Sequence, residues 1–382
     1  MKSIFDDIIN RHHTNSMKWD KYAQQDIIPL WVADMDFKAP AAILDAMHRI
    51  TAHGVLGYSL VPDELVTVVL KRLKNLHHWD VKPEWLVWLP GLVPAITLSC
   101  QSVGQAGDAV MSTTPVYGPF MKCPDSADRQ LQKIPLKLEN GRYTFDFEAM
   151  KAAITPATKL FLLCNPYNPA GTVFTKQELE TLLAVCLEHN IIICADEIHC
   201  DLILDQNLEH ISIGSLSDIA GNQTITLLSP SKTFNIPGLG GAFAVIPNDG
   251  IRERFAKLRY TNTPMLSAYA YDAMLVAYRD CRPWHQELLG YLKANHDYLL
   301  TEINAIPGLE MQPLEATYLA WIDTRKTGIE NIGQVLEEAG VGISEGGFFF
   351  DGKGFIRLNF GTPRSVLVEA VKRIKNTMTN NS

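Results

Sequence analysis

Short runs of β-branched and apolar residues alternate with helical patterns from about residue 85 onward. This alternation is typical of βα units that form a largely parallel sheet. The strands that it predicts are residues 86–88, 109–112, 159–164, 191–196, 224–228 and 242–246. Thr175 and Glu178 fit a capping box, and apolar residues follow at helical spacing, so a helix is expected to begin there. Most of the chain is therefore predicted to be an α/β domain whose mostly parallel sheet is flanked by helices.

The pattern changes after about residue 285, where longer helical stretches replace the alternation. It predicts helices over 283–303, 329–339 and 365–378, and a strand over 317–323. This order is typical of a smaller α+β domain. We expect an N-terminal segment (1–45) that joins the small domain, a large domain over 46–284 and a C-terminal small domain over 285–382.

Composition and charge narrow the class of partner. The 382 residues are 47% hydrophobic and 20% charged, as in folded globular proteins. Lys and Arg total 34 against 42 Asp and Glu, with no basic run, which argues against nucleic-acid or membrane partners and favours a small molecule. The start lacks a signal-peptide core and no apolar run would cross a bilayer, so we expect a cytoplasmic protein. Seven scattered cysteines predict reduced, mostly buried thiols and no metal site.

Lys232 stands in the sequence SPSKTFNIPGLGG, directly after a predicted buried strand. Ser229, Ser231 and Thr233 flank it. A lysine beside a sheet edge and hydroxyls loses its proton more easily than a solvated one and forms a Schiff base with an aldehyde. Taken alone, the motif fits a surface lysine in a polar loop better.

Asp196 ends a run of apolar residues in ADEIH, where a buried carboxylate is costly without a cation or a hydrogen-bond donor. A protonated pyridine nitrogen of a bound cofactor would serve, because the acid keeps that nitrogen charged. The alternative is an ordinary turn or capping carboxylate. In NPYNPAG, Asn168 and Gly171 also fit a simple turn.

Two further segments have the chemistry of a cofactor site. Tyr117 in TTPVYGPF follows a predicted strand and can lie flat on a planar cofactor, although an aromatic residue there also fits the core. In LPGLVPAI, Gly91, Leu92 and Val93 fall at a predicted helix start, whose free backbone N–H groups bind phosphate. An ordinary helix start has the same pattern.

In the order PGLVPA, TPVYGPF, NPYNPAG, ADEIH and SPSK, these segments resemble fold-type I enzymes that use pyridoxal 5′-phosphate (PLP), the aspartate aminotransferase superfamily. The resemblance spans nearly the whole chain. More narrowly, the chain is similar to the MalY/PatB subgroup of cystathionine β-lyases, also called carbon–sulfur β-lyases. The segments that carry this likeness are LWVADMDFKAP, GYS (57–59), ADEIHCDL, SPSKTFNIPGL, EATYLAWID and GFIRLNFGTPRS. The resemblance implies the fold-type I architecture and PLP as the cofactor.

The same resemblance assigns cofactor contacts residue by residue. It implies that Lys232 holds PLP as a Schiff base, that Asp196 pairs with the pyridine nitrogen and that Tyr117 stacks on the ring. Asn168 is implied as a donor to the 3′ oxygen of the ring. His199 stands where many aminotransferases carry a tyrosine near that oxygen. The phosphate is expected to be held by the backbone of Leu92 and Val93 and by Ser229 and Ser231.

Two more residues are assigned through the resemblance. Tyr58 is implied to reach the phosphate and the substrate of the neighbouring subunit, which implies a homodimer with shared active sites. Arg357 matches the arginine that grips the substrate α-carboxylate, for which a planar guanidinium fork is suited. Without the resemblance, Arg357 would be predicted to be a solvated strand residue.

One position departs from the wider superfamily. Aspartate aminotransferase-like enzymes usually carry an arginine eight residues after the Schiff-base lysine, and here that position is Gly240. The departure favours the lyase subgroup and leaves less positive charge around the phosphate.

The implied reaction is the α,β-elimination of L-cystathionine, or of a related cysteine S-conjugate, to homocysteine or another thiol, pyruvate and ammonia. Lys232 is expected to remove the Cα proton, Lys232 or Tyr58 to protonate the thiolate, and Tyr117 to complete the catalytic set. Loops 31–37 and 346–352 are expected to line the pocket beyond the sulfur, with Phe348 to Phe350 as an apolar wall or as core.

Two alternatives to the lyase stay open. An aminotransferase needs the same residues, because negative charge at Cα can be quenched by a proton on the cofactor instead of by loss of a thiolate, and the fold does not choose between them. The other alternative is a lyase scaffold with an added transcription-regulatory binding role.

Overall fold

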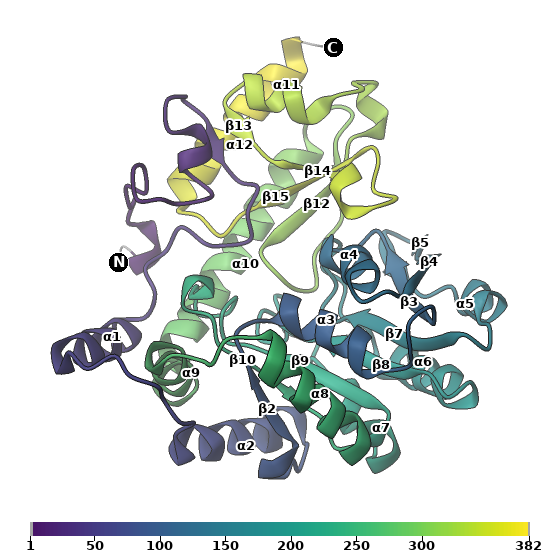
Figure 1. Cartoon of the computed structure of the whole chain (residues 1–382). Helices are drawn as coiled ribbons and strands as arrows, with labels where there is room; N and C mark the ends of the chain where they lie inside the picture. Colours follow the sequence, from purple (N-terminus) through teal and green to yellow (C-terminus); the bar gives the residue numbers. More distant parts are fainter. Residues whose placement is uncertain (1–2, 381–382) are drawn as a thin grey trace.

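A seven-stranded sheet forms the centre of the larger part of the molecule (Figure 1). The structure is a computed structural model that describes residues 3–380. The strand order is β2-β10-β9-β8-β7-β3-β4. All neighbours pair in parallel except β10, which is antiparallel to β9 and β2. The bounds are β2 Leu86–Leu89, β3 Ala109–Thr114, β4 Gln130–Pro135, β7 Thr158–Cys164, β8 Ile192–Asp196, β9 Thr224–Leu228 and β10 Ala242–Val245.

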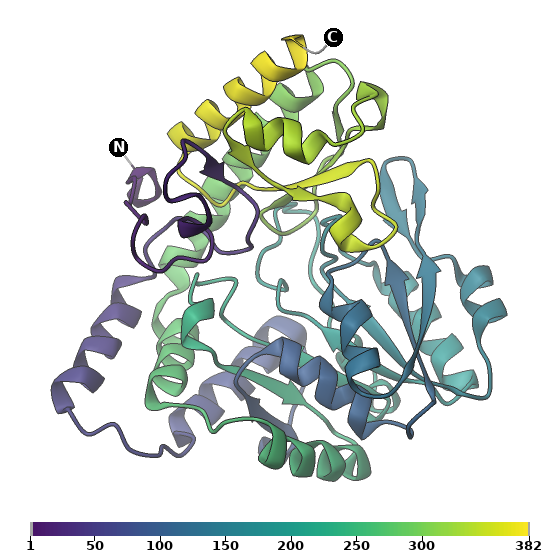
Figure 2. The same ribbon diagram turned by 45° about the horizontal axis from the view of Figure 1, so that its top comes forward.

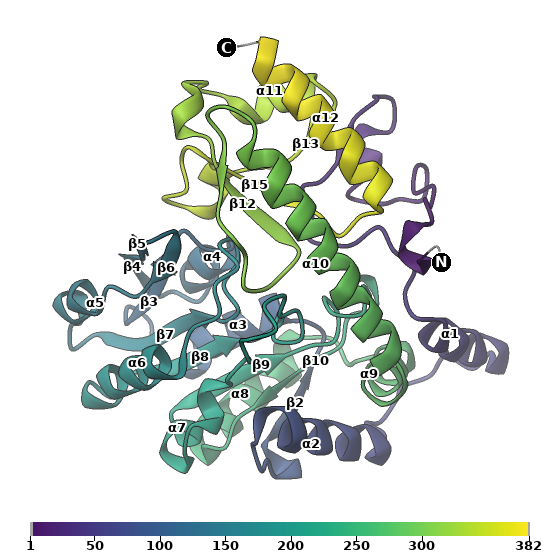
Figure 3. The ribbon, with the colours of Figure 1, turned by 180° about the vertical axis from the view of Figure 1, so that it is seen from behind.

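The predicted mostly parallel sheet is confirmed, and the six predicted strands agree with the observed ones to within two residues. Helices cover both faces of this sheet: Figures 1 and 3 show α3 on one side and α6 on the other. The capping box predicted for α6 (Lys176–Glu188) is present, because Thr175 Oγ1 accepts the N–H of Glu178 and the Glu178 carboxylate accepts the N–H of Thr175. The other helices on this sheet are α3 Leu92–Ser102, α4 Pro119–Ser126, α5 Phe147–Ala153, α7 Asp218–Asn222 and α8 Asp249–Asn262.

A four-stranded sheet forms the core of the upper part of the molecule in Figure 2, in the order β11-β12-β15-β14. Two long helices, α10 (Arg282–Asn304) and α12 (Arg364–Asn380), pack beside it, and α10 continues down to α9 (Figure 3). The N-terminal segment joins this part, because β1 (Ile28–Pro29) pairs in parallel with β13 (Val341–Gly342). The strands are β11 Glu310–Met311, β12 Leu319–Asp323, β14 Ser344–Glu345 and β15 Phe355–Asn359, and α11 spans Ile332–Glu338.

Three helices and a hairpin complete the fold. Helices α1 (Ala41–His53) and α2 (Asp63–His77) both contact α9 (Ala268–Asp280), and the hairpin comprises β5 (Lys137–Glu139) and β6 (Arg142–Thr144). All seven cysteines are buried and free, as predicted. Within residues 3–380, no helix combines the length and the apolar character that crossing a bilayer requires.

Candidate active site

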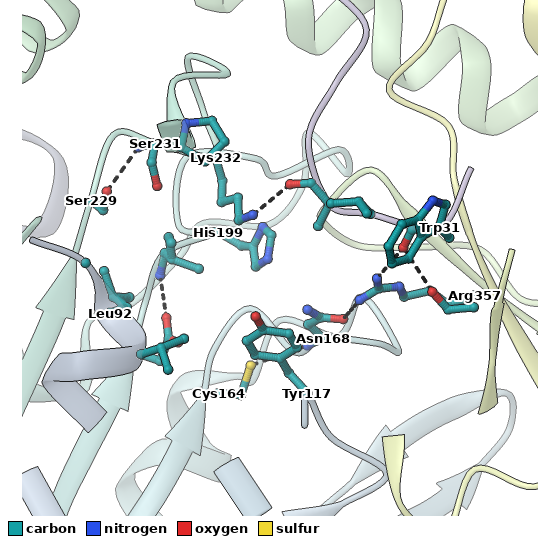
Figure 4. A pocket seen from close by; sticks show the side chains of 18 of the residues that line it. Trp31, Leu92, Tyr117, Cys164, Asn168, His199, Ser229, Ser231, Lys232 and Arg357 are labelled. Carbon is teal, nitrogen blue, oxygen red and sulfur yellow. Dashed lines mark hydrogen bonds between the residues drawn. The ribbon is translucent and has the colours of Figure 1, made fainter. Parts of the chain in front are cut away.

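A cavity of about 820 Å³ opens between the carboxyl ends of the parallel strands and the four-stranded sheet (Figure 4). Polar groups from both sheets reach it because parallel strands end at the same edge, where ligands of α/β sheets bind. Every predicted site residue except Tyr58 lines this cavity. These residues are Leu92, Val93, Tyr117, Asn168, Asp196, His199, Ser229, Ser231, Lys232 and Arg357.

Lys232 follows β9 and points into the cavity, where its ammonium donates to the Ala33 carbonyl at 2.7 Å (Figure 4). The surrounding protein removes water from the ammonium group and lowers the pKa of Lys232 to about 8. The positive charge of Arg357 acts in the same direction, whereas the carboxylates of Asp34 and Asp196 oppose it. Near neutral pH, part of the population therefore carries a neutral, nucleophilic amine.

Asp196 is the last residue of β8 and is buried. Its carboxylate accepts the N–H of Ile198 at 3.0 Å, and no lysine or arginine within residues 3–380 forms an ion pair with it. Burial raises the pKa of Asp196 to about 7. A cationic ligand group beside the carboxylate would offset this penalty.

His199 lies three residues beyond Asp196 and is buried beside Lys232 (Figure 4). Its Nδ1 has no hydrogen-bond partner in the described part of the chain. Burial, together with the charges of Lys232 and Arg357, lowers the pKa of His199 to about 3, so the ring is neutral. A buried imidazole nitrogen without a partner is available to a polar ligand atom.

Tyr117 and Asn168 come from the loops after β3 and β7. The two loops are joined by a hydrogen bond from the Tyr117 N–H to the Asn168 carbonyl at 3.1 Å. The Asn168 N–H in turn donates to Cys164 Sγ at 3.4 Å. The side chains of Tyr117 and Asn168 thus lie together on one wall of the cavity (Figure 4).

The opposite end of the cavity offers backbone donors. Helix α3 begins at Leu92, so the N–H groups of its first turn have no intrahelical acceptor. The Ser229 hydroxyl donates to the Gly241 carbonyl at 2.8 Å and accepts the Ser231 N–H at 3.1 Å, which leaves the Ser231 hydroxyl as the freer donor. Gly240 also lines the cavity, with no cationic side chain at that position.

Arg357 lies on β15 and is buried, with its guanidinium donating to Asn168 Oδ1 at 3.0 Å and to the Trp31 carbonyl at 2.9 Å. The expectation from the residues alone, a solvated strand residue, is wrong, because β15 is an inner strand that pairs with both β12 and β14. Burial lowers the pKa of Arg357 to about 10, and its Nε has no partner in the described residues. An anionic ligand group would stabilise the buried positive charge and accept a hydrogen bond from Nε.

Tyr58 lies outside the cavity of its own chain. It is 95% exposed, within the segment 54–62 that connects α1 to α2. Its ring therefore has no role in a site built by this chain alone.

Sequence reasoning missed the way in which the N-terminal segment closes the cavity. Loop 31–37 was expected to line the pocket, but the expectation did not include its backbone carbonyls. The Trp31 carbonyl accepts a hydrogen bond from Arg357, and the Ala33 carbonyl accepts one from Lys232. Met17 and Cys164 also line the cavity without having been predicted. Backbone acceptors leave no mark in a sequence, so no residue pattern could have located them.

The chain matches the family model for aminotransferase class I and II over residues 25–374. Cystathionine β-lyase PatB from Bacillus subtilis (strain 168) is 35% identical over 390 residues, which cover 97% of this chain and 98% of PatB. The crystal structure of OvoB is 42% identical and covers 98% of this chain and 99% of its own, with a TM-score of 0.96. The structure of cystalysin from Treponema denticola, which contains a PLP cofactor, is 32% identical over 100% of both chains, with a TM-score of 0.96. The chain therefore belongs to the aminotransferase class I and II family and, within it, to the PatB group of cystathionine β-lyases.

Proposed function

We propose that this chain is a PLP-dependent carbon–sulfur β-lyase. It converts an L-cysteine S-conjugate such as L-cystathionine, with one water, into a thiol, pyruvate and ammonia. The observation that carries the proposal is one cavity in which Lys232 with a lowered pKa, the buried carboxylate of Asp196 and the buried guanidinium of Arg357 lie together. The relatives support it, since PatB is a cystathionine β-lyase and the cystalysin structure holds PLP.

The residues of the cavity fit PLP. Lys232 is the amine for its aldehyde, and Asp196 supplies the anion that a protonated pyridine nitrogen requires. The His199 Nδ1 atom and the Asn168 amide lie where a ring oxygen can be bound, with the ring of Tyr117 as a stacking surface. The phosphate would be held by the backbone N–H groups of Leu92 and Val93 and by Ser231, with Ser229 supporting Ser231.

The bound cofactor supplies an electron-withdrawing ring that stabilises negative charge at the substrate Cα. Arg357 binds the α-carboxylate through its guanidinium fork and orients the Cα–H bond toward Lys232. The neutral amine of Lys232 takes the Cα proton, because its pKa of about 8 leaves part of it unprotonated near neutral pH. The resulting ammonium then donates that proton to the sulfur as the Cβ–S bond breaks.

We also propose a homodimer in which Tyr58 of the partner subunit completes each site. Segment 54–62 places four large apolar side chains in water, with exposures of 73% for Val55, 68% for Leu56, 95% for Tyr58 and 88% for Leu60. A contiguous exposed apolar strip of this kind fits a protein interface. There the Tyr58 phenol would reach the phosphate and act as a second proton donor to the thiolate.

The function is tested by adding PLP to the purified protein, recording the absorbance spectrum and then adding L-cystathionine. We expect a visible cofactor band that stays with the protein after unbound PLP is removed, and pyruvate and thiol released in equal amounts. Lys232→Ala should release neither product. A band without pyruvate, together with amino-group transfer to the cofactor, would favour the aminotransferase. No band would remove the cofactor assignment.

The shared site is tested with hybrid dimers. Lys232→Ala and Tyr58→Phe should each be impaired, and mixing them should restore roughly a quarter of the wild-type activity, because half of the dimers are hybrids with one intact site. Hybrids without recovered activity would place Tyr58 outside the partner's site.

A further inference from the structure

The opening of the cavity is apolar. Residues that line the cavity and are also solvent-exposed mark this opening, and the large ones away from the start of α3 are Met17 and Phe348, with exposures of 73% and 57%. Trp31 and Ile343 also line the cavity. The charged groups of the site, Asp196, Lys232 and Arg357, belong instead to the inner part, among the buried strand ends.

Of the described residues that line the cavity and are exposed, Glu345 is the one with a charged side chain. Its carboxylate, however, points away from the site. On β14, Ser344 pairs with Arg357 and Glu345 pairs with Ile356. Neighbouring residues of a strand point to opposite faces, so Glu345 lies on the face of Ile356 and not on that of Arg357. Its carboxylate packs against Gly333 of α11. Glu345 therefore contributes backbone to the opening and no charge.

Two lysines near the opening lie beyond its aromatic rings. Lys21 Nζ is 5.1 Å from the ring centroid of Trp31. It donates hydrogen bonds to the Tyr22 hydroxyl at 2.6 Å and to the Glu337 carboxylate at 3.2 Å. Lys122 Nζ is 5.9 Å from the ring centroid of Phe348. Neither lysine lines the cavity. A ligand that emerges through the opening thus meets ring faces and aliphatic groups first.

The far end of L-cystathionine carries both an ammonium and a carboxylate. Neither meets an oppositely charged side chain among the described residues that line this opening, so cystathionine gains no ion pair there. The segment proposed to come from the partner subunit, GVLGYSLVP over 54–62, has no charged residue either. Apolar substituents, in contrast, gain from burial against Met17, Trp31 and Phe348.

We infer that the preferred substrates are cysteine S-conjugates whose sulfur substituent is apolar or aromatic, an inference that rests on the proposed lyase function. The matched pair for testing it is L-cystathionine and S-(3-methylbutyl)-L-cysteine. The second compound keeps the branched chain of cystathionine but replaces the distal ammonium and carboxylate by methyl groups. Both release an alkyl thiolate, so the leaving group is comparable.

The holoenzyme should show a kcat/KM for pyruvate release about tenfold or more higher with the methylbutyl conjugate. Phe348→Arg places a cation at the opening and should shift the ratio of the two kcat/KM values toward cystathionine. Lys122→Met is the control and should leave the ratio unchanged. Titration calorimetry with Lys232→Ala and added PLP measures the two dissociation constants without turnover and should give the same order.

Three results would overturn the inference. A wild-type preference for cystathionine would do so while leaving the lyase function intact. A selective rise in KM for cystathionine in Lys122→Met would show that Lys122 binds its distal carboxylate. Absence of pyruvate from both conjugates and from other cysteine conjugates, despite a cofactor band, would refute the lyase function itself and the inference with it.

Discussion

Replacing Arg357 by Gln removes the guanidinium that we assign to the substrate α-carboxylate. The side chain is buried, its Nε has no partner in the described residues, and burial lowers its pKa to about 10. A carboxylate that enters this position pairs with a charge already withdrawn from water. Its loss should therefore weaken catalysis far more than loss of an exposed arginine.

The size of the effect follows from the burial of the pair. Truncating one partner of a buried, hydrogen-bonded charge pair costs about 2–5 kcal/mol. At about 1.4 kcal/mol per factor of ten, kcat/KM should fall roughly 30- to 4,000-fold. The fall should appear for substrates that carry the carboxylate and should be much smaller for those that lack its charge.

The assay compares an S-alkyl-L-cysteine with its carboxamide in wild type and Arg357→Gln. Wild type should strongly favour the acid, and the variant should lose most of that preference. Because Arg357 also holds Asn168 and Trp31, the cofactor band and the thermal midpoint are recorded as controls for the site and the fold. If the variant loses the same factor for acid and amide, Arg357 acts on the shape of the site and the carboxylate assignment is wrong.

Three further changes test other parts of the structure. Burial lowers the pKa of His77 from 6.5 to about 3, so its stabilising contribution is present above pH 6.5 and is lost as the pH falls. Through this group the free energy of unfolding should drop by about 2 kcal/mol between pH 7 and pH 5, and denaturant unfolding at both pH values should show a smaller drop in His77→Leu. Gly240→Ala should cost about 1–3 kcal/mol, because Gly240 adopts φ 69° and ψ −157°, whereas Gly238→Ala should be nearly neutral in thermal unfolding, because a Cβ added there meets no atom within 4 Å. Thr175→Ala should cost about 1 kcal/mol through the lost cap of α6, and an equal loss in Thr181→Ala, in the exposed middle of the helix, would argue against capping as the cause.

The sheet was predictable because its strands are short apolar runs whose ends are marked by polar motifs. Asp196 and Lys232 stand at the ends of such runs, and parallel strands bring their ends to one edge, which explains why both residues line the same cavity. The cap of α6 was predictable for a similar reason, since Thr175 and Glu178 interact within one turn.

A local sequence pattern could not predict that Arg357 is buried, nor which acceptors its guanidinium contacts. The contact from Arg357 to the Trp31 carbonyl spans 326 residues, and the contact from Lys232 to the Ala33 carbonyl spans 199. Both arise only when the N-terminal segment pairs with β13 and returns across the cavity. Helices α1 and α2 were also not predicted, although α2 buries Leu65, Val69, Leu73 and His77 at helical spacing.

The residues of the site alone do not separate a lyase from an aminotransferase, but the opening of the cavity limits the second possibility. Among the described lining residues, the cationic side chains are those of Lys232 and Arg357. In the proposed arrangement Lys232 binds the cofactor and Arg357 binds the substrate α-carboxylate. An acidic amino donor would place its second carboxylate near Met17 and Phe348, where no cation receives it. Transamination would thus disfavour acidic amino donors. Apolar cysteine conjugates are the neutral substrates that distinguish the two reactions, since loss of their thiolate yields pyruvate, whereas transfer of their amino group leaves the carbon–sulfur bond intact.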